Sequence, residues 1–442
     1  MNIYALSSGR GPSGIAIVRI SGKDTLKVCK NLTKLKEINS NEVNYCKFYD
    51  PKNDSVIDPE ALLLWFPGPN SYTGEDLAEF QVHGGNAVIN ALLKALSEQD
   101  NCRLAEPGEF TKLAFQNDKI DLLKAESIGD LIHAETEMQR TQAVKLVQGN
   151  ASNYYNDLRE KLIKSLAYIE AKIDFAEDDL PEKVLKEVHN SIKEIHKDIH
   201  KIIEDNKIGE KIRDGFKVSI TGEVNAGKSS LLNLIAKRDV AIVSDEAGTT
   251  RDVIETYLNI DGYPVILADT AGIRDAKNEV EKKGISLALG KSKEADLNIV
   301  VIDNSSKNIN DEIKKMINKD TIVLLNKSDV QNKQNHKFDA DTVLASVKEN
   351  KNIDSLIKKI KEKLSKKFMS NNSTLITRER HRVKLNQCLK EIDNFLKKDP
   401  NKDLELAAED LRMATRHLGS IVGKVDVEEI LGSIFKDFCI GK

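Results

Sequence analysis

The stretch Gly222-Glu223-Val224-Asn225-Ala226-Gly227-Lys228-Ser229 fits the phosphate-binding pattern G-x-x-x-x-G-K-[ST]. An apolar run at 216–220 predicts a strand before it, and the pattern at 229–235 predicts a helix after it. The glycines let successive backbone N–H groups converge on a phosphate, and the positive end of the helix adds to that field. We therefore expect Lys228 to bridge the β- and γ-phosphates of a nucleotide and the Ser229 hydroxyl to bind Mg²⁺. A glycine-rich turn that binds nothing is the alternative for this motif alone.

Three further motifs follow in order along the chain. They are Thr249-Thr250-Arg251-Asp252, Asp269-Thr270-Ala271-Gly272 and Asn326-Lys327-Ser328-Asp329. Asp269 follows an apolar run at 265–268 that predicts a buried strand; its carboxylate would hold Mg²⁺ through water, and the Gly272 N–H would meet the γ-phosphate. An ordinary strand-end turn would explain Asp-Thr-Ala-Gly by itself. The ordered set indicates a Ras-like P-loop GTPase.

The fourth motif selects the base. A carboxylate at Asp329 can accept from both N1–H and the 2-amino group of guanine, a donor pair that adenine lacks. Asn326 can bond the other side of the base, and the stem of Lys327 can cover its face. An apolar run at 321–325 predicts the preceding strand, and the loop at 345–347, which contains Ser346, is expected to be the last loop that contacts the base.

Hydrolysis requires a further group, because Ile273 stands where a Ras-like switch has a glutamine that orients the attacking water. The Asn225 side-chain oxygen could bind a cation beside the β- and γ-phosphates, where a monovalent cation would neutralise charge in the transition state. The oxygen-rich loop at 244–250 could close over that cation. A side chain that caps its own backbone is the alternative for Asn225.

The residues expected to contact GTP lie in the phosphate loop, the loop at 244–250 and the two later motifs. They are Asn225, Ala226, Gly227, Lys228, Ser229, Ser230, Ser244, Asp245, Glu246, Ala247, Gly248, Thr249, Thr250, Asp269, Thr270, Ala271, Gly272, Asn326, Lys327, Asp329 and Ser346.

Composition bounds the remaining possibilities. A chain of 442 residues predicts two or three domains. A net charge of −3 argues for a soluble protein and against a strongly basic nucleic-acid binder, although a local basic patch is compatible with it. No apolar run approaches membrane-spanning length, and no secretory segment is recognisable at the N-terminus. The five scattered cysteines include no C-x-x-C pair, so we expect neither zinc nor disulfides, and a cytoplasmic location.

The first part of the chain, residues 1–118, has the pattern of an α+β domain. Strands are predicted at 14–22, 61–66 and 77–83, a dense turn at 67–74, and a helix at 86–97.

Helical periodicity dominates from 119 to 208 and returns from 370 to 442, on either side of the GTPase motifs at 209–369. Pro181 separates two helices of the first part. Apolar residues share a helix face in each segment: Leu158, Leu162, Leu166, Ile169 and Ile173; Val184, Val188, Ile192, Ile195, Ile199 and Ile202; Leu404, Ala408, Leu411 and Leu418; Ile430, Ile434 and Phe438. The expected architecture is multidomain, with an α+β domain, a helical bundle domain, and an α/β GTPase domain inserted between the halves of the bundle.

With these segments in place, the whole chain resembles the MnmE (TrmE) family of tRNA-modifying GTPases. The resemblance is carried by the motifs at 67–76 (PGPNSYTGED) and 103–111 (RLAEPGEFT), and most specifically by the tail Cys439-Ile440-Gly441-Lys442, which matches the family's C-terminal Cys-x-Gly-Lys. It implies that residues 1–118 form a tetrahydrofolate-binding and dimerisation domain. It further implies a homodimer that joins the flavoprotein MnmG (GidA) in a heterotetramer, with tRNA as substrate.

The activity implied by the resemblance is addition of an aminomethyl or carboxymethylaminomethyl group at C5 of the wobble uridine (U34) of certain tRNAs. The one-carbon unit would come from 5,10-methylene-tetrahydrofolate, with 5-formyl-tetrahydrofolate as a bound analogue. The family's folate contacts fall on Arg19, Glu79, Lys119 and Lys442. The pterin ring of a folate offers a donor pair to a carboxylate such as Glu79, and the carboxylate tail of the folate suits Arg19 or Lys119. From the residues alone, an ion pair on a strand face explains Arg19 and Glu79, and Lys119 and Lys442 read as solvated lysines.

The resemblance also implies ligands for K⁺ and Mg²⁺. Asn225, Ser244, Glu246 and Thr249 would bind K⁺, and Thr250 would join Ser229 on Mg²⁺. Two catalytic positions lie further along the chain. Glu281 matches the glutamate that orients the attacking water, and Arg274 would stabilise the switch. A solvated glutamate at a helix start is the alternative for Glu281.

Two other functions share some of these motifs. A ribosome-assembly or RNA-binding switch GTPase would need a basic RNA-binding module, which neither end of the chain resembles. A folate-dependent transferase regulated by nucleotide would bind folate through residues 1–118 and would not require GTP turnover.

Overall fold

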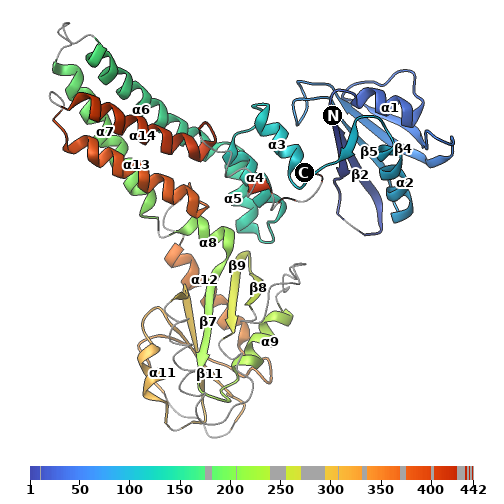
Figure 1. Ribbon diagram of the computed structural model, residues 1–442. Helices are drawn as coiled ribbons and strands as arrows, with labels where there is room; N and C mark the ends of the chain where they lie inside the picture. The colour runs from blue at the N-terminus through green and yellow to red at the C-terminus, as the bar shows by residue number, and fades with distance from the viewer. Residues whose placement is uncertain are drawn as a thin grey trace, which may run out of the picture. The chain divides into compact units, whose positions relative to one another are not determined.

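The computed structural model describes most of the chain and separates it into two compact units (Figure 1). Unit 1 comprises Met1–Gly129, Leu146–Glu160 and Thr415–Lys442, and unit 2 comprises Asp130–Lys145 and Lys161–Ala414. The described residues are 1–9, 11–174, 182–205, 207–238, 255–269, 294–306, 308–330, 336–368, 375–399, 403–425, 434–435, 438 and 441.

Unit 1 contains a six-stranded sheet of order β3-β4-β5-β2-β1-β6. Its strands are β1 (Asn2–Leu6), β2 (Ser13–Ser21), β3 (Val43–Tyr49), β4 (Val56–Phe66), β5 (Leu77–Gly84) and β6 (Cys102–Leu104). Pairing is antiparallel except between β1 and β6. Helices α1 (Thr25–Thr33) and α2 (Asn86–Ser97) bury their apolar faces against the sheet in one core. The α+β prediction is confirmed, and α2 has the predicted bounds.

A second, smaller core in unit 1 joins β1 to α3 (Glu109–Gln116), through Ile3, Ala5 and Phe110. Helix α4 (Leu122–Ile132) follows, and its Ala125 packs with Phe435 and Phe438 of the C-terminal segment. Gly441, near the C-terminus, accepts a hydrogen bond through its carbonyl from Ser7 Oγ at 2.8 Å. Gly441 therefore lies beside the end of β1.

The helical segments are α5 (Glu137–Val147), α6 (Asn150–Asp174), α7 (Glu182–Ile203), α8 (Ile208–Asp214), α13 (Glu379–Lys397) and α14 (Leu404–Val422). Most residues of the predicted apolar stripes are buried: Leu158, Leu162 and Ile169 on α6, Val188 to Ile202 at helical spacing on α7, and Ala408, Leu411 and Leu418 on α14. Leu166, Ile173 and Leu404 are half-buried. Helices α7 and α13 pack side by side (Figure 1). Ile430 lies outside the described residues.

The GTPase motifs of unit 2 lie on a second six-stranded sheet, of order β12-β11-β10-β7-β9-β8. Its strands are β7 (Phe216–Gly222), β8 (Glu255–Ile260), β9 (Tyr263–Asp269), β10 (Leu297–Asp303), β11 (Ile322–Asn326) and β12 (Asp341–Leu344). All pairs are parallel except β8 with β9. One apolar core is shared by the sheet with helices α8, α9 (Lys228–Arg238) and α12 (Ile353–Phe368). A second apolar core is shared by the sheet with α11 (Asp311–Met316). The carboxyl ends of parallel strands meet at one edge, so this topology gathers the motifs.

Among the described residues, no helix combines the length and apolar character needed to cross a membrane.

Candidate functional site

The phosphate loop runs from the end of β7 to the start of α9. Gly222 has φ of 143° and Gly227 has φ of 102°, a region that side chains rarely adopt. A Cβ at Gly222 would lie 2.0 Å from the Val301 carbonyl oxygen, and one at Gly227 would lie 2.3 Å from Asn326 Nδ2. Both positions therefore require glycine. Lys228 Nζ donates to the carbonyls of Gly222 at 3.0 Å and Glu223 at 2.7 Å, which places its charge inside the loop.

Two serines open α9 directly after that lysine. Ser229 and Ser230 lie in the exposed first turn, where helix N–H groups lack intrahelical partners. Asn225 has a left-handed backbone with φ of 61° and an exposed side chain. The predicted strand–loop–helix context of this motif is confirmed.

The base motif begins at Asn326, the last residue of β11, and this residue ties the motif to the phosphate loop. This side chain is 3% exposed. Its Nδ2 donates to the Ala226 carbonyl at 2.8 Å, and its Oδ1 accepts from the Val347 N–H at 2.9 Å. One amide thus holds the phosphate loop against the loop after β12. The sequence predicted a contact with the base for Asn326 and missed this bridging role.

Asp329 and Ser346 form the other part of the base site. Ser346 Oγ donates to Asp329 Oδ1 at 2.6 Å. This hydrogen bond lowers the pKa of Asp329, so the carboxylate stays ionised as an acceptor. The predicted proximity of the loop at 345–347 to the base motif is present.

Lys327 is held by a residue that sequence reasoning missed. Its Nζ lies 2.6 Å from Asp303 Oδ2 at the end of β10, the strand beside β11. Burial opposes ionisation of Asp303, but hydrogen bonds from Lys327 and Ser305 lower the pKa of Asp303 overall. In the sequence, the signal for this partner is a carboxylate, Asp303, directly at the end of an apolar run that predicts a neighbouring parallel strand.

A cavity of about 630 Å³ joins the phosphate loop to the base motif. Its lining includes Asn225, Gly227, Ser230, Lys327 and Asp329. Phosphate-binding and base-reading groups therefore face one space whose volume falls in the range typical of small-molecule sites.

The switch residues lie mostly outside the described residues. These are Ser244, Asp245, Glu246, Ala247, Gly248, Thr249, Thr250, Thr270, Ala271, Gly272, Arg274 and Glu281. The backbone of Asp269 ends β9 in register with Ile220 of β7. This pairing puts the start of the Asp-Thr-Ala-Gly motif on the strand beside the one that leads into the phosphate loop.

In unit 1 the structure brings two of the predicted folate residues together. Arg19 on β2 and Glu79 on β5 are directly paired, and their side chains are 17% and 20% exposed. Arg19 Nη2 and Nε lie 2.7 Å and 3.1 Å from Glu79 Oε1. The strand-face ion pair expected from the residues alone is therefore present.

Two aromatic rings flank this ion pair, and the sequence did not single them out. The Arg19 guanidinium lies 5.6 Å from the ring centroid of Tyr72 and 5.7 Å from that of Phe110. Tyr72 lies in the predicted turn at 67–74, and Phe110 lies in the motif at 103–111. Lys119 Cε would lie 3.3 Å from a Cβ built on Gly74 of the same turn. Lys442 and Cys439 lie outside the described residues.

A phosphate loop between strand and helix, with a base motif on a neighbouring strand of a mainly parallel sheet, defines a P-loop GTPase. Two family models match the chain: the GTP-binding protein TrmE N-terminus over residues 2–119 and the MnmE helical domain over residues 122–439. The chain belongs to the MnmE (TrmE) family.

Full-length relatives agree with this assignment. A protein of Pelagibacter ubique (strain HTCC1062) described as tRNA modification GTPase MnmE is 58% identical, with 100% of both chains covered. Proteins with the same description from Rickettsia bellii (strain RML369-C) and Parvibaculum lavamentivorans are 44% and 42% identical, with 100% of this chain and 99% of each relative covered.

Proposed function

We propose that this GTP hydrolase is stimulated by K⁺ and modifies tRNA. With a flavoprotein partner of the MnmG (GidA) kind, it adds an aminomethyl or carboxymethylaminomethyl group to C5 of the wobble uridine of certain tRNAs. The observation that carries the proposal is the cavity shared by the phosphate loop and the base motif, in a chain 58% identical over its full length to a tRNA modification GTPase.

The residues around the cavity suit guanine nucleotide with Mg²⁺ and K⁺. Ser229 in the first turn of α9 is the Mg²⁺ ligand of the phosphate loop, with Thr250 as the second. Asn225 lines the cavity with an exposed side chain, which fits a K⁺ ligand beside the phosphates; Ser244, Glu246 and Thr249 complete that set. A bound cation supplies positive charge where the transition state becomes more negative. Glu281 orients the attacking water, and Arg274 stabilises the switch.

The Arg19–Glu79 site in unit 1 suits a tetrahydrofolate. A pterin is flat and donates two parallel hydrogen bonds, which a carboxylate such as Glu79 accepts. The rings of Tyr72 and Phe110 beside Arg19 provide apolar surface for such a ring. Lys119 and Lys442 then interact with other polar groups of the cofactor, which brings the one-carbon unit of 5,10-methylene-tetrahydrofolate.

The sheet of unit 1 offers a surface for a homodimer. Val43 and Tyr45 on edge strand β3 are 62% and 66% exposed, and they pair with Leu64 and Leu62 of β4. Exposed apolar side chains on an edge strand favour contact with another protein surface. We assign this surface to a second copy of the chain, in a complex that also includes the flavoprotein and acts in the cytoplasm.

The proposal is tested by mass spectrometry of tRNA nucleosides from a strain lacking the gene. We expect 5-aminomethyl-type wobble uridines to disappear, and to return with the intact gene but not with an Asn225→Ala copy. Asn53→Ala, an exposed turn asparagine in unit 1, is the control and should restore them. An unchanged nucleoside profile in the deletion strain would refute the tRNA function and favour a ribosome-assembly GTPase.

A further inference from the structure

Helix α8 lies between α7 and the first strand of the GTPase sheet, and its two faces have different partners. Ile208 and Ile212 are 4% and 6% exposed and belong to the apolar core of that sheet, together with Phe216 and Val265. Glu210 and Arg213 of α8 instead contact the helical segments of unit 2, whereas Lys211 pairs with Asp296, directly before β10, at 2.8 Å. The helix is therefore part of both structures.

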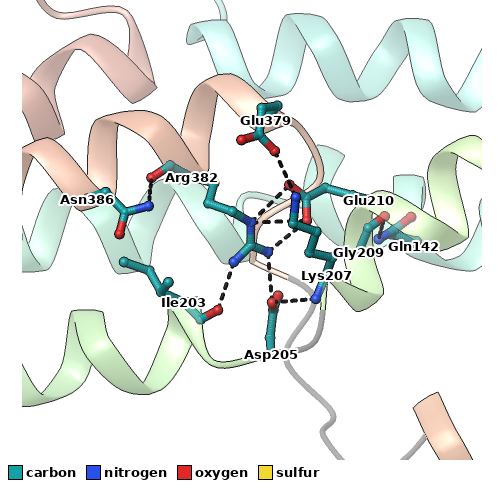
Figure 2. A network of polar contacts seen from close by, with 9 residues as sticks. All are labelled: Gln142, Ile203, Asp205, Lys207, Gly209, Glu210, Glu379, Arg382 and Asn386. Atoms are coloured by element: carbon teal, nitrogen blue, oxygen red, sulfur yellow. Dashed lines mark hydrogen bonds and ion pairs between the residues drawn. The ribbon is translucent and has the colours of Figure 1, made fainter. Parts of the chain in front are cut away.

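The first polar contact of α8 is made through Arg382 of α13 (Figure 2). Arg382 Nη2 lies 2.7 Å from Glu210 Oε2 and 2.8 Å from Asp205 Oδ1, and Nε lies 3.1 Å from Glu210 Oε1. Its Nη1 donates to the Ile203 carbonyl, which ends α7, at 2.7 Å. The three charged side chains are 7–9% exposed. We call Arg382, Asp205 and Glu210 the buried triad.

A second group of contacts holds both ends of the same helix, through Arg213 near its C-terminus and Gly209 near its N-terminus. Asp130 Oδ1 accepts from Arg213 Nε of α8 at 3.0 Å and from Arg378 Nη2, just before α13, at 2.7 Å. Gln142 Nε2 of α5 donates to the Gly209 carbonyl at 3.0 Å. A Cβ at Gly209 would lie 2.1 Å from the Ile376 carbonyl oxygen, so the two segments that enter and leave the GTPase sheet touch there.

The β8–β9 hairpin makes a further connection to the helical segments. Gly262 in its turn accepts from the Met138 N–H at 3.2 Å, and Asn259 Nδ2 donates to the Glu135 carbonyl at 3.2 Å. At its other end, β8 begins after the loop at 244–250 and β9 ends at Asp269. In the sequence, the hairpin thus connects to the two segments expected to contact the nucleotide, and its turn contacts residues at and just before the start of α5.

Stability alone does not account for the buried triad. Buried ion pairs contribute little net stability compared with apolar side chains of similar volume, because both ions lose their hydration. What they supply is a defined geometry, since a planar guanidinium accepts few arrangements of two carboxylates. Burial opposes the charge, yet hydrogen bonds to Glu210 and Asp205 raise the pKa of Arg382, so it stays charged.

We propose that Arg382 is a positioning residue that holds α8 to α7 and α13, so that nucleotide-dependent movement of the GTPase sheet is transmitted to the helical segments. An inserted domain with loose linkers would lose this transmission, because each linker could absorb the movement. In the described part of the chain, α8 on one side and residues 376–378 on the other share contacts, through Asp130 and at Gly209. This inference rests on the proposed function only where tRNA modification is the readout.

The test uses the full-length protein and compares Arg382→Gln with Arg412→Gln. Arg412 on α14 also pairs with two carboxylates, Glu170 and Glu409, but it is 54% exposed. We expect Arg382→Gln to retain GTP affinity and basal hydrolysis while tRNA modification falls about tenfold, within the roughly 5- to 150-fold range of coupling between sites. The Arg412→Gln control should match wild type in all three measurements.

Two further variants separate positioning from stability. In Arg382→Met combined with Asp205→Leu and Glu210→Leu, apolar packing replaces the buried triad and restores stability. We expect modification to stay low in this stable variant, whereas a purely structural role predicts full recovery. Arg382→Lys keeps the positive charge but lacks the planar guanidinium, so we expect a loss of tRNA modification smaller than that of Arg382→Gln. Because the carboxylates keep a cationic partner, this variant is expected to stay folded in every measurement.

Hydrogen exchange gives a readout that does not involve tRNA. In wild type, exchange of α7 and α13 should differ between GDP and a non-hydrolysable GTP analogue, and the difference should shrink in Arg382→Gln and Arg382→Lys. Equal nucleotide-dependent exchange in wild type and in both variants, or none in wild type, would overturn the inference. A strain whose tRNA is normal without the gene would instead count against the proposed function, and exchange would still decide the role of Arg382.

Discussion

Replacing Asn326 with alanine should weaken nucleotide binding, although the side chain lies mostly beneath the site. The substitution removes the hydrogen bonds to the Ala226 carbonyl and the Val347 N–H, both in buried surroundings. Each buried backbone group left unpaired costs about 1–3 kcal/mol, so the two together cost about 2–6 kcal/mol. In the free variant, the phosphate loop and the loop after β12 can move so that water pairs with the two backbone groups. Nucleotide binding must then order both loops without the lost hydrogen bonds, so part of the cost falls on binding.

We therefore expect the effect in affinity, near the lower end of that range: about 2 kcal/mol, or roughly 30-fold at 1.4 kcal/mol per tenfold change. The assay is titration of full-length protein with a fluorescent GDP analogue at fixed Mg²⁺ and salt. Asn326→Asp should bind more weakly still, because a carboxylate oxygen would face the Ala226 carbonyl in place of a donor.

The control is Asn318→Ala, which removes an exposed asparagine from a loop of the same unit and should leave affinity unchanged. If Asn326→Ala bound the analogue within about threefold of wild type, the bridging hydrogen bonds would not determine the site and the reasoning from unpaired backbone groups would be wrong.

The remaining predictions concern single side chains. Asp329→Asn should shift preference from guanine toward xanthine nucleotides, measured as the ratio of kcat/KM values; an unchanged preference for GTP would exclude the base-reading role. Because the pKa of Asp303 is lowered in the folded protein, its ion pair with Lys327 stabilises above the unfolded pKa of about 4, and this contribution is lost as pH falls through the lower folded value. The stability difference between wild type and Asp303→Asn should therefore vanish in strong acid, which denaturation at several pH values measures; a pH-independent difference would contradict it. Burial raises the pKa of Cys46 to about 11, so iodoacetamide at pH 8 should label Cys46 only after unfolding, as peptide mass spectrometry can show; rapid native labelling would disprove this.

Local pattern was sufficient for much of the fold. The apolar runs at 216–220 and 265–268 lie in strands β7 and β9, and the helical pattern at 86–97 is helix α2. These elements could be predicted because the apolar residues that each buries recur along the sequence as an apolar run or at helical spacing. Short elements such as β1, β6 and α8 were missed, since a few residues carry too little periodicity.

Prediction of the candidate site was uneven for a related reason. The four GTPase motifs could be read because their residues are close in sequence and their chemistry requires particular residue types. The partners that hold those motifs could not, because Asn326 bonds a residue 100 positions away and Lys327 one 24 positions away. No periodicity records such pairs.

By itself, the sequence determined the class of nucleotide site, the α+β and helical character of the flanking segments, and the residue types at the phosphate loop. The tertiary structure alone decided which side chains support them: Asn326 between two loops, Asp303 beside Lys327, and Arg382 on carboxylates 172 and 177 positions earlier in the chain. Local structure follows from neighbours along the chain, whereas an ion pair between distant residues exists only once packing has brought the two elements together and removed the water that would otherwise solvate both charges.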